Sequence, residues 1–598
     1  VSSRNEKSTS LLGSWLAAPI SRRALLGSTI LITLSQSSIG KALGVSAPVI
    51  TQILGRPTNN SIALSLLANQ DLSAYVEYGY TKTKYSAKSP ISSVTQGEPF
   101  TFDIVNLKSN TRVYYRVRYK SKDAKSYQTG KQYSFVNSRK KSQEFSFTVQ
   151  GDTHPERAGK MFRSELYFVT MANIAKQLPD FHILMGDDFS IDPLISKGQA
   201  TKTNVENIYR THRNWLTIPG STVPIFLVNG NHEQAAAYLL DGTTTNPAVL
   251  AGNARNKFYP LPAPNEFYSG NIEEIPGVGL PRDYYSFTWG DALFVTLDPY
   301  WHSTAAVDNV AGDEKGGGDQ QGGGGKGGGK GARDLWKVGI GDTQYSWLKK
   351  TLEESDAKYK FVFAHHNRGQ GRGGIIPAKL FEWGGYEQDG KTWGFDKNRP
   401  GWSKPIHQLF KDNGVNIFFQ GHDHLFAHEV MDDVHYQQVP MPSDSTYMIG
   451  KLANADAYTS DTLDGTGHIK VNVSSSCVKV DYVKAYLPKD TLDGKHKNRE
   501  IGFSYTIGSC IVTGINDLPS ASNSEFVEVF PNPAKNKLFL RFINNINSFE
   551  AKLININGDI LLISNNKEID VSGWQPGIYF LNIQAGNQAA RKKIIISN

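Results

Sequence analysis

The alternation of apolar and polar residues changes character twice along the chain and divides it into three parts. In residues 46–138 apolar and polar positions alternate between regularly spaced turn residues, which is typical of the strands of a β-sandwich. From residue 144 short apolar runs alternate with amphipathic segments of helical period, such as 204–216 and 343–352. Residues 525–598 return to short alternating segments. The pattern predicts a multidomain protein with an N-terminal β-sandwich, a central α/β domain and a small all-β domain at the C-terminal end.

Five apolar runs in the central part each end in residues that can bind a metal ion. The runs have the length and the β-branched and aromatic content of buried strands, and they cover residues 145–150, 181–185, 223–228, 361–364 and 415–420. The strings that follow them are Gly151-Asp152-Thr153-His154, Gly186-Asp187-Asp188, Gly230-Asn231-His232-Glu233, His365-His366 and Gly421-His422-Asp423-His424. Because an open α/β sheet binds its ligands at the carboxyl ends of its strands, we expect these strings to meet along one edge of a sheet.

The composition describes an ordinary globular protein, and its charge gives no argument for a nucleic-acid partner. A chain of 598 residues is too long for one hydrophobic core. Of the formal charge of +8, residues 1–42 contribute +4 (five Lys or Arg, one Glu) and residues 524–598 contribute +2 (eight Lys or Arg, six Asp or Glu), which leaves +2 for the rest. The two cysteines, Cys477 and Cys510, fit either two unrelated buried residues or a disulfide.

Residues 1–45 predict export. Arg22 and Arg23 precede an apolar run, 24–34, that is too short to cross a membrane and is followed by small residues, the pattern of a secretory signal peptide. The paired arginines also resemble a twin-arginine signal, so both export routes fit. No other run is long and apolar enough for a transmembrane segment. The glycine-rich stretch at 311–333 lacks the Ser or Thr of a phosphate-binding loop, and we interpret it as a flexible insertion.

Taken together, the five metal-binding strings resemble the calcineurin-like metallophosphoesterase superfamily, whose motifs run Asp-x-His, Gly-Asp, Gly-Asn-His-Asp/Glu, His and Gly-His-x-His. The resemblance implies a catalytic domain over residues 141–516 with an α/β/β/α sandwich fold, and a site for two transition-metal ions, Fe, Zn or Mn. Such a pair activates a water molecule that attacks the phosphorus of a phosphate ester. The resemblance implies that one ion is held by Asp152, His154, Asp187 and His424, and the other by Asp187, Asn231, His365 and His422.

The resemblance also assigns a catalytic role to His232, as the residue that protonates the leaving oxygen. Where purple acid phosphatases have an iron-binding tyrosine, and other members an aspartate that orients this histidine, the chain has Ser190. Asp188 and Glu233 are therefore the alternatives for the partner of His232. Arg368, in the loop after the fourth string, suits either phosphate contact or a solvated loop, and the substrate-binding residues stay unassigned.

The flanking parts resemble known domains as well. Residues 46–140 are similar to a fibronectin type III-like domain, the usual companion of the catalytic domain in purple acid phosphatases, although Val113 stands where that domain has its corner tyrosine. Residues 525–598 resemble the C-terminal sorting domain of the type IX secretion system of Bacteroidetes, with residues 517–524 as the linker. The resemblance rests on three strings, Pro531-Asn532-Pro533, Asn555-Ile556-Asn557-Gly558 and Pro576-Gly577-Ile578-Tyr579. It implies the secretion machinery as a partner and passage through the periplasm to the cell surface or the medium.

Three functions follow, in order of preference. The first is a secreted phosphoesterase with a binuclear metal site that hydrolyses small-molecule phosphate esters, with phosphomonoesters favoured. The second is a 5′-nucleotidase or phosphodiesterase that acts on nucleotides with the same metal site. The third is a surface binding or adhesion protein with a degenerate enzyme core, against which the intact ligand strings argue.

Overall fold

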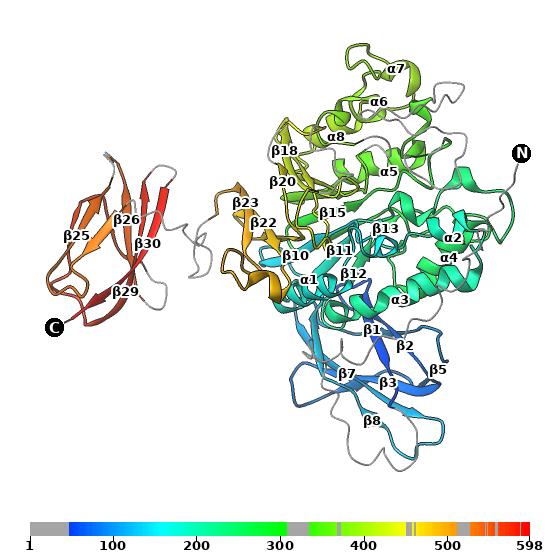
Figure 1. The fold of residues 1–598 in the computed structure, drawn as a ribbon, viewed down its shortest axis with the longest axis horizontal. Helices are drawn as coiled ribbons and strands as arrows, with labels where there is room; N and C mark the ends of the chain where they lie inside the picture. The colour runs from blue at the N-terminus through cyan, green and yellow to red at the C-terminus, as the bar shows by residue number, and fades with distance from the viewer. Residues whose placement is uncertain are drawn as a thin grey trace, which may run out of the picture.

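The structure, a computed structural model, describes residues 47–597 except 306, 308–333, 368–371, 450–456, 460–461, 511–526, 544–545, 547, 556–559 and 586–587. The predicted signal peptide, the glycine-rich insertion, the linker and Arg368 lie outside the described residues. Figure 1 displays the N-terminal part in blue, the large central part from cyan to yellow and the C-terminal part in orange and red. No helix within the described ranges combines the length and the apolar character needed to cross a membrane.

The N-terminal part consists of two antiparallel sheets that share one apolar core. One sheet contains β1 (Ile50–Gly55), β2 (Ile62–Ala68) and β6 (Phe100–Ile104). The other contains β3 (Leu72–Gly79), β4 (Ala87–Lys88), β5 (Ser92–Val94), β7 (Arg112–Ser121), β8 (Gln128–Thr129) and β9 (Tyr133–Val136). Along β7 the side chains of Val113, Tyr115 and Val117 are buried, whereas Arg116 between them is partly exposed. This is the alternation that the sequence predicts for a half-buried strand.

Two larger sheets pack face to face in the central part. Aromatic side chains from both sheets meet between them, and the ring centroids of Phe147 and Phe294 lie 5.1 Å apart. The first sheet has the order β12-β11-β10-β21-β22-β23, with β10 (Phe145–Gln150), β11 (Phe181–Leu184), β12 (Ile225–Leu227), β21 (Gly467–Val473), β22 (Cys477–Lys484) and β23 (Ile501–Gly508). The second has the order β13-β14-β15-β16-β17-β19-β18-β20, with β13 (Ser269–Gly270), β14 (Tyr285–Trp289), β15 (Ala292–Thr296), β16 (Tyr359–Phe363), β17 (Ile417–Gln420), β18 (Phe426–Met431), β19 (Val434–Gln438) and β20 (Thr462–Leu463).

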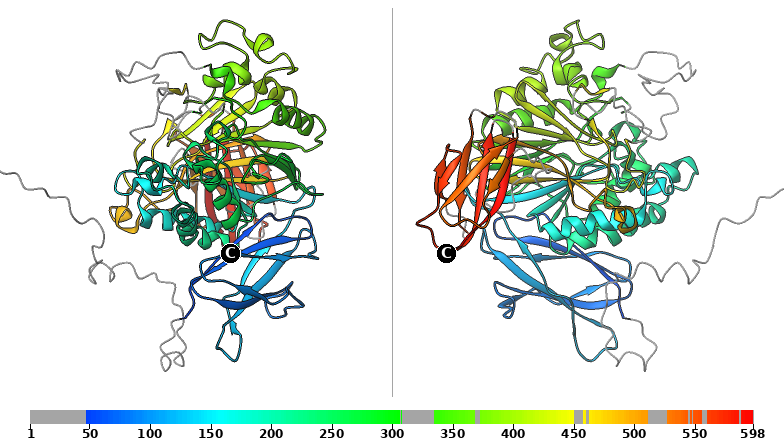
Figure 2. Two further views of the ribbon diagram at one scale, coloured as in Figure 1. Left: turned by 90° about the vertical axis from the view of Figure 1, so that its right-hand side faces the viewer. Right: turned by 60° about the vertical axis from the view of Figure 1, so that its left-hand side comes forward.

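Helices pack against the side of each sheet that faces away from the other (Figure 2). The first sheet shares an apolar core with α1 (Ser164–Gln177), α3 (Lys202–Gly220) and α4 (Pro247–Phe258). The second shares one with α5 (Gly341–Glu353), α6 (Phe381–Gly384), α7 (Phe395–Asn398) and α8 (Ile406–Asp412). The amphipathic segments at 204–216 and 343–352 lie within α3 and α5, and Thr201 caps α3 by accepting the N–H of Asn204.

The ligand-bearing strands belong to two sheets, so the prediction of one shared sheet was wrong. Strands β10, β11 and β12 run parallel in the first sheet, and β16 and β17 run parallel in the second. Their carboxyl ends nevertheless meet, because Asp152 after β10 lies 3.9 Å from His365 after β16. In both sheets the ligand-bearing strands are buried on both faces, so an apolar run carries no information about which sheet its strand joins.

Helix α3 also joins the N-terminal part to the central part. Arg213 on this helix is fully buried, and its guanidinium donates hydrogen bonds to Thr51 Oγ1 (3.1 Å) on β1 and to Ser65 Oγ (3.1 Å) and O (2.9 Å) on β2. Tyr115 on β7 donates to the carbonyl of Ser221 just after the helix, at 2.8 Å. These buried bonds fix the N-terminal part against the first sheet and its helices.

The C-terminal part contains two further antiparallel sheets around their own core. Its strands are β24 (Val527–Phe530), β25 (Lys537–Phe542), β26 (Glu550–Ile554), β27 (Ile560–Ser564), β28 (Glu568–Asp570), β29 (Gly577–Ala585) and β30 (Gln588–Ile596). Before this part, Cys477 at the start of β22 and Cys510 just after β23 form a disulfide. The sequence left open whether the two cysteines are unrelated or form a disulfide, and in the structure they form a disulfide.

Candidate metal centre

The turns that carry the predicted ligands have an unusual backbone. Five of the seven predicted ligands have positive φ angles, in the left-handed region that non-glycine residues rarely adopt: Asp152 (60°), His154 (48°), Asp187 (57°), His422 (78°) and His424 (59°). Asp and His are among the residues that tolerate this region best, and such backbone strain concentrates at functional sites. All seven predicted ligands are buried, and their side chains meet between the ends of the two sheets.

One group of four side chains is the set that the resemblance implies for the first ion. Asp152, His154, Asp187 and His424 each direct one ligand atom into a space in which these atoms lie within 4.8 Å of one another. His154 Nε2 is 3.0 Å from His424 Nε2 and 3.6 Å from Asp187 Oδ2, and His424 Nε2 is 3.5 Å from Asp152 Oδ1. Two carboxylates and two imidazoles therefore surround one point.

A second group lies on the other side of Asp187. His365 Nε2 is 3.1 Å from Asp187 Oδ2, and His422 Nδ1 is 3.1 Å from Asn231 Oδ1. Asp187 thus contacts both groups through the same oxygen. His366, which lies outside the predicted set, joins His365 and His422 in a cluster whose ligand atoms also lie within 4.8 Å of one another.

Hydrogen bonds at Nδ1 fix the orientation of two of the histidine rings, those of His154 and His365. His154 Nδ1 donates to Glu156 Oε1 at 2.8 Å, and His365 Nδ1 donates to the carbonyl of Met185 at 2.8 Å. In each ring this leaves Nε2 as the atom that faces the other ligands. The nitrogens are thereby oriented as metal sites require.

Glu233 holds the second and third strings together. Its carboxylate accepts the backbone N–H groups of Gly230 (2.7 Å), Asp187 (3.0 Å), Asp188 (2.8 Å) and Phe189 (3.0 Å). Gly230 is needed for this approach, because a Cβ at its position would lie 2.3 Å from Asp187 Oδ1.

The electrostatics of the site favour an ionised Asp187, neutral rings at His154 and His424, and a protonated ring at His365. Burial, the largest influence, opposes the charge on Asp187, but His365, His232 and His154 around it lower its pKa well below the ordinary value. Burial likewise lowers the pKa of His154 and of His424 well below that of a free histidine. For His365 the nearby carboxylates overcome burial and raise the pKa to about 10. Neutral imidazole and ionised carboxylate are the forms in which these side chains bind metals, so binding of an ion would release the proton that His365 holds.

The residues present fit a transition-metal centre. Asp187 Oδ2 and His365 Nε2 are buried and lie 3.1 Å apart, and neither forms a hydrogen bond of normal geometry within the described part of the chain, which is unusual for buried polar atoms. Both point into the space between the two groups. Mixed nitrogen and oxygen donors suit Zn, Fe or Mn, whereas Mg and Ca prefer oxygen alone.

His232 has a partner that the sequence did not suggest. Its Nδ1 donates to Asp192 Oδ2 at the start of α2 (Asp192–Ser196), and Asp192 Oδ1 accepts from Gln234 Nε2 at 2.7 Å. Burial opposes a charge on His232, but Asp187 and Asp192 raise its pKa to about 9. Its Nε2 lies 3.8 Å from Asp187 Oδ2, beside the predicted metal ligands.

The two alternatives for this partner were therefore wrong. Asp188 accepts hydrogen bonds from Thr153 and Gln150, and Glu233 is engaged by backbone N–H groups. Some members of the superfamily have the orienting aspartate at the position of Ser190. In this chain the aspartate stands two residues later, at Asp192. An acidic residue shortly after Ser190 was therefore the signal in the sequence that could have identified the partner of His232. The buried hydroxyl of Ser190 itself forms no hydrogen bond within the described ranges.

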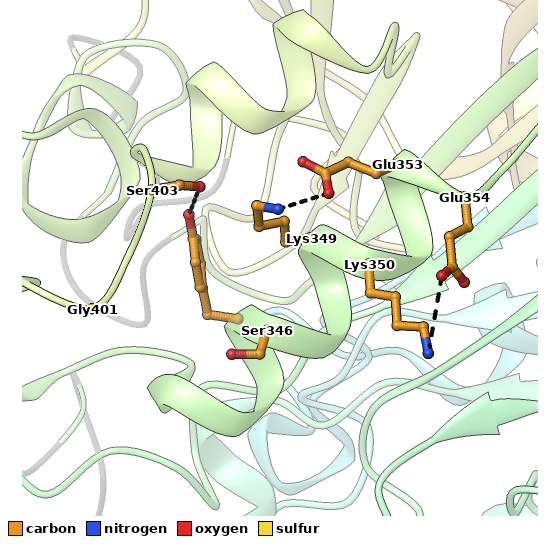
Figure 3. A pocket seen from close by; sticks show the side chains of 8 residues that line it. Ser346, Lys349, Lys350, Glu353, Glu354, Gly401 and Ser403 are labelled. Atoms are coloured by element: carbon orange, nitrogen blue, oxygen red, sulfur yellow. Dashed lines mark hydrogen bonds and ion pairs between the residues drawn. The ribbon is translucent and has the colours of Figure 1, made fainter.

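A surface hollow of about 410 Å³ lies elsewhere, beside α5 (Figure 3). None of the predicted ligands lines it. Its charged groups already pair along the helix, Lys349 with Glu353 at 2.7 Å and Lys350 with Glu354 at 4.0 Å. The hollow thus offers no unpaired cation to an anionic substrate.

Comparison with known proteins defines the class. Residues 145–426 match the family model of the calcineurin-like phosphoesterases, and residues 528–597 match that of the secretion system C-terminal sorting domain. The chain therefore contains a calcineurin-like phosphoesterase domain and a sorting domain, as the sequence resemblance predicted. It is a phosphoric ester hydrolase that the type IX secretion system exports to the cell surface or the extracellular space.

Two solved structures are among those that match the chain. One is the purple acid phosphatase PPD1 from yellow lupin seeds, with 16% identity over 78% of each chain and a TM-score of 0.48. The other is PhoD, with 14% identity over 77% of this chain and 90% of that chain and a TM-score of 0.50. At this identity the likeness to PhoD indicates a shared fold. No curated protein sequence matches the chain.

Proposed function

We propose that the protein is an exported phosphomonoesterase with a binuclear transition-metal centre. The observation that carries this proposal is the position of Asp187, whose Oδ2 lies 3.6 Å from His154 Nε2 in one group and 3.1 Å from His365 Nε2 in the other. A carboxylate in contact with both groups is suited to bridge two ions. One ion would be held by Asp152, His154, Asp187 and His424, and the other by Asp187, Asn231, His365 and His422.

Two such ions supply an activated water and stabilise the charge that develops during phosphoryl transfer. The remaining chemistry belongs to the protein. His232 carries a proton at Nε2 and donates it to the leaving oxygen, while Asp192 holds Nδ1 and so fixes the orientation of the ring. The burial of all these groups excludes bulk water from the donors and strengthens their electrostatic interactions.

We further assign the domains as residues 46–140, a fibronectin type III-like β-sandwich, 141–516, an α/β/β/α catalytic domain, and 525–598, the sorting domain. The separate cores of the first and last parts and the shared core between the two central sheets support these boundaries. Because the part that follows the catalytic domain is a sorting domain and not a nucleotide-binding domain, we favour simple phosphate monoesters over nucleotides as substrates.

The proposal is tested by elemental analysis of the protein purified without chelator, combined with a panel of p-nitrophenyl phosphate, bis(p-nitrophenyl) phosphate and a nucleoside 5′-monophosphate. We expect about two metal ions per chain and the highest kcat/KM for the simple monoester. Full activity with one ion or none would refute the binuclear centre. A preference for the diester or the nucleotide would refute the substrate class.

A further inference from the structure

Arg157 brings a guanidinium group to the edge of the site. It ends the short 3-10 turn η3 (Pro155–Arg157), which follows directly after His154. Its Nη2 lies 3.3 Å from His232 Nε2, on the side of that ring away from Asp192. The Arg157 side chain is 21% exposed, so it lies between the buried ligands and the solvent.

The backbone of Arg157 forms several hydrogen bonds, whereas its guanidinium forms only single contacts with each neighbour. Its carbonyl accepts the N–H groups of Lys160 (3.0 Å), Met161 (3.3 Å) and Phe162 (3.4 Å), which closes a tight loop. The guanidinium contacts Glu156 Oε1, Met161 Sδ and His232 Nε2, each at 3.3 Å. None of these contacts is bidentate, and they engage three of the five N–H groups of the guanidinium, so N–H groups remain for an anion.

Two other arginines provide a contrast. Arg139 is fully engaged, because it makes a two-pronged pair with Asp180, with Nη2 at 2.8 Å from Oδ1. Arg372 next to the fifth string donates to the carbonyl of His422 at 2.8 Å and to Asp423 at 3.1 Å, so it supports the loop. Among the arginines that the structure describes, Arg157 is the one whose guanidinium contacts His232, and its N–H groups are only partly used.

We propose that Arg157 binds the terminal oxygens of the substrate phosphate and thereby favours monoesters over diesters; this rests on the proposed function. His232 Nε2 is 3.3 Å from the guanidinium and 3.8 Å from Asp187 Oδ2, so a phosphate group beside His232 would reach both the guanidinium and ions held at Asp187. A monoester dianion has three terminal oxygens and two negative charges. It can therefore bind the ions and also accept two N–H groups of one guanidinium. A diester has two terminal oxygens and one charge.

The experiment compares Arg157→Ala and Arg157→Lys with wild type in the metal-loaded full chain. Arg163→Ala is the matched control, because Arg163 follows the same loop at the start of α1, its side chain is 41% exposed, and it pairs with Glu165 at 3.3 Å and not with His232. We measure KM and kcat for p-nitrophenyl phosphate and bis(p-nitrophenyl) phosphate, the affinity for inorganic phosphate by calorimetry, and the metal content. For Arg157→Ala we expect KM for the monoester and Kd for phosphate to rise roughly 10- to 100-fold, as for the loss of a charge-assisted hydrogen bond.

The diester KM should change by less than about threefold in the same variant, and Arg157→Lys should recover part of the loss, because lysine restores the charge but not the fork. Metal content should match wild type. Equal losses on monoester and diester, or an unchanged phosphate affinity, would overturn the proposal. Loss of metal in Arg157→Ala would also overturn it, by making Arg157 a support for Glu156 and His154. A metal-loaded wild type that hydrolyses no ester would refute the proposed function, whereas the phosphate affinities would still decide the role of Arg157.

Discussion

Replacing Asp192 by alanine tests how His232 is held for catalysis. The carboxylate accepts the Nδ1 proton of His232 and is itself fixed by Gln234 at 2.7 Å, so its loss frees the ring to rotate. A hydrogen bond to a charged group contributes about 1.5–3 kcal/mol, which corresponds to a decrease in kcat of roughly 10- to 150-fold if the bond acts in the transition state. Removal of the whole imidazole in His232→Ala sets the upper limit, about 10²–10⁴-fold for a general acid.

The assay measures kcat for p-nitrophenyl phosphate and for an alkyl phosphate, together with metal content. Nitrophenolate leaves with little help from an acid, so both variants should lose less activity on that substrate than on the alkyl phosphate. Ser190→Ala is the control, since its hydroxyl makes no hydrogen bond within the described ranges and its removal should change kcat by less than about twofold. Equal losses of His232→Ala on the two substrates would refute the general-acid role. A larger loss in Asp192→Ala than in His232→Ala would refute the idea that Asp192 acts through this ring.

Three other predictions concern the metals and the stability of the fold. Asp187→Ala should lose both metal and activity, since two cations would be left without their shared anion, and elemental analysis of the variant that still finds two ions would contradict this. Arg213→Met leaves buried carbonyls without donors and should lower the free energy of unfolding by about 3 kcal/mol in urea denaturation. As the control, Arg210→Met replaces a partly exposed arginine of the same helix with longer bonds, 3.3 Å to the carbonyl of Gly97 and 3.4 Å to Asn207, and should change that free energy by less than about 1 kcal/mol. The denatured, unreduced protein should show no thiol that reacts with an alkylating reagent, and Cys477→Ser with Cys510→Ser should lower stability by up to about 3.7 kcal/mol for a loop of 33 residues.

The sequence was most informative where function and local structure coincide. Each predicted ligand follows an apolar run directly, so the end of a strand and the position of a side chain could be inferred together. The structure brings all seven of these residues to one place, and the resemblance implied the same four residues, Asp152, His154, Asp187 and His424, that form the first group. The two amphipathic helices were also predictable, because their apolar faces repeat with helical period.

What the sequence did not reveal depends on contacts between distant segments. The division of the strands between two sheets leaves no mark on apolar runs that are buried on both faces. The contact between His232 and Asp192 spans 40 residues and depends on where the short helix α2 begins. His366 joins His422 only because two different strings approach each other in space. None of these pairings follows from spacing along the chain.

The backbone conformation of the ligand residues also affects the stability of the site. Five ligand residues adopt left-handed conformations, each of which costs on the order of 1–3 kcal/mol when nothing compensates it. Buried carboxylates offset part of this cost by accepting backbone N–H groups at the same turns: Asp152 accepts that of His422, and Glu233 accepts four around Asp187. The carboxylates that stabilise these turns by accepting backbone N–H groups therefore lie at or next to the atoms that would bind the ions. An ion bound only by the folded state adds its binding free energy to the stability of these turns, so metal affinity and the conformation of the strings depend on each other.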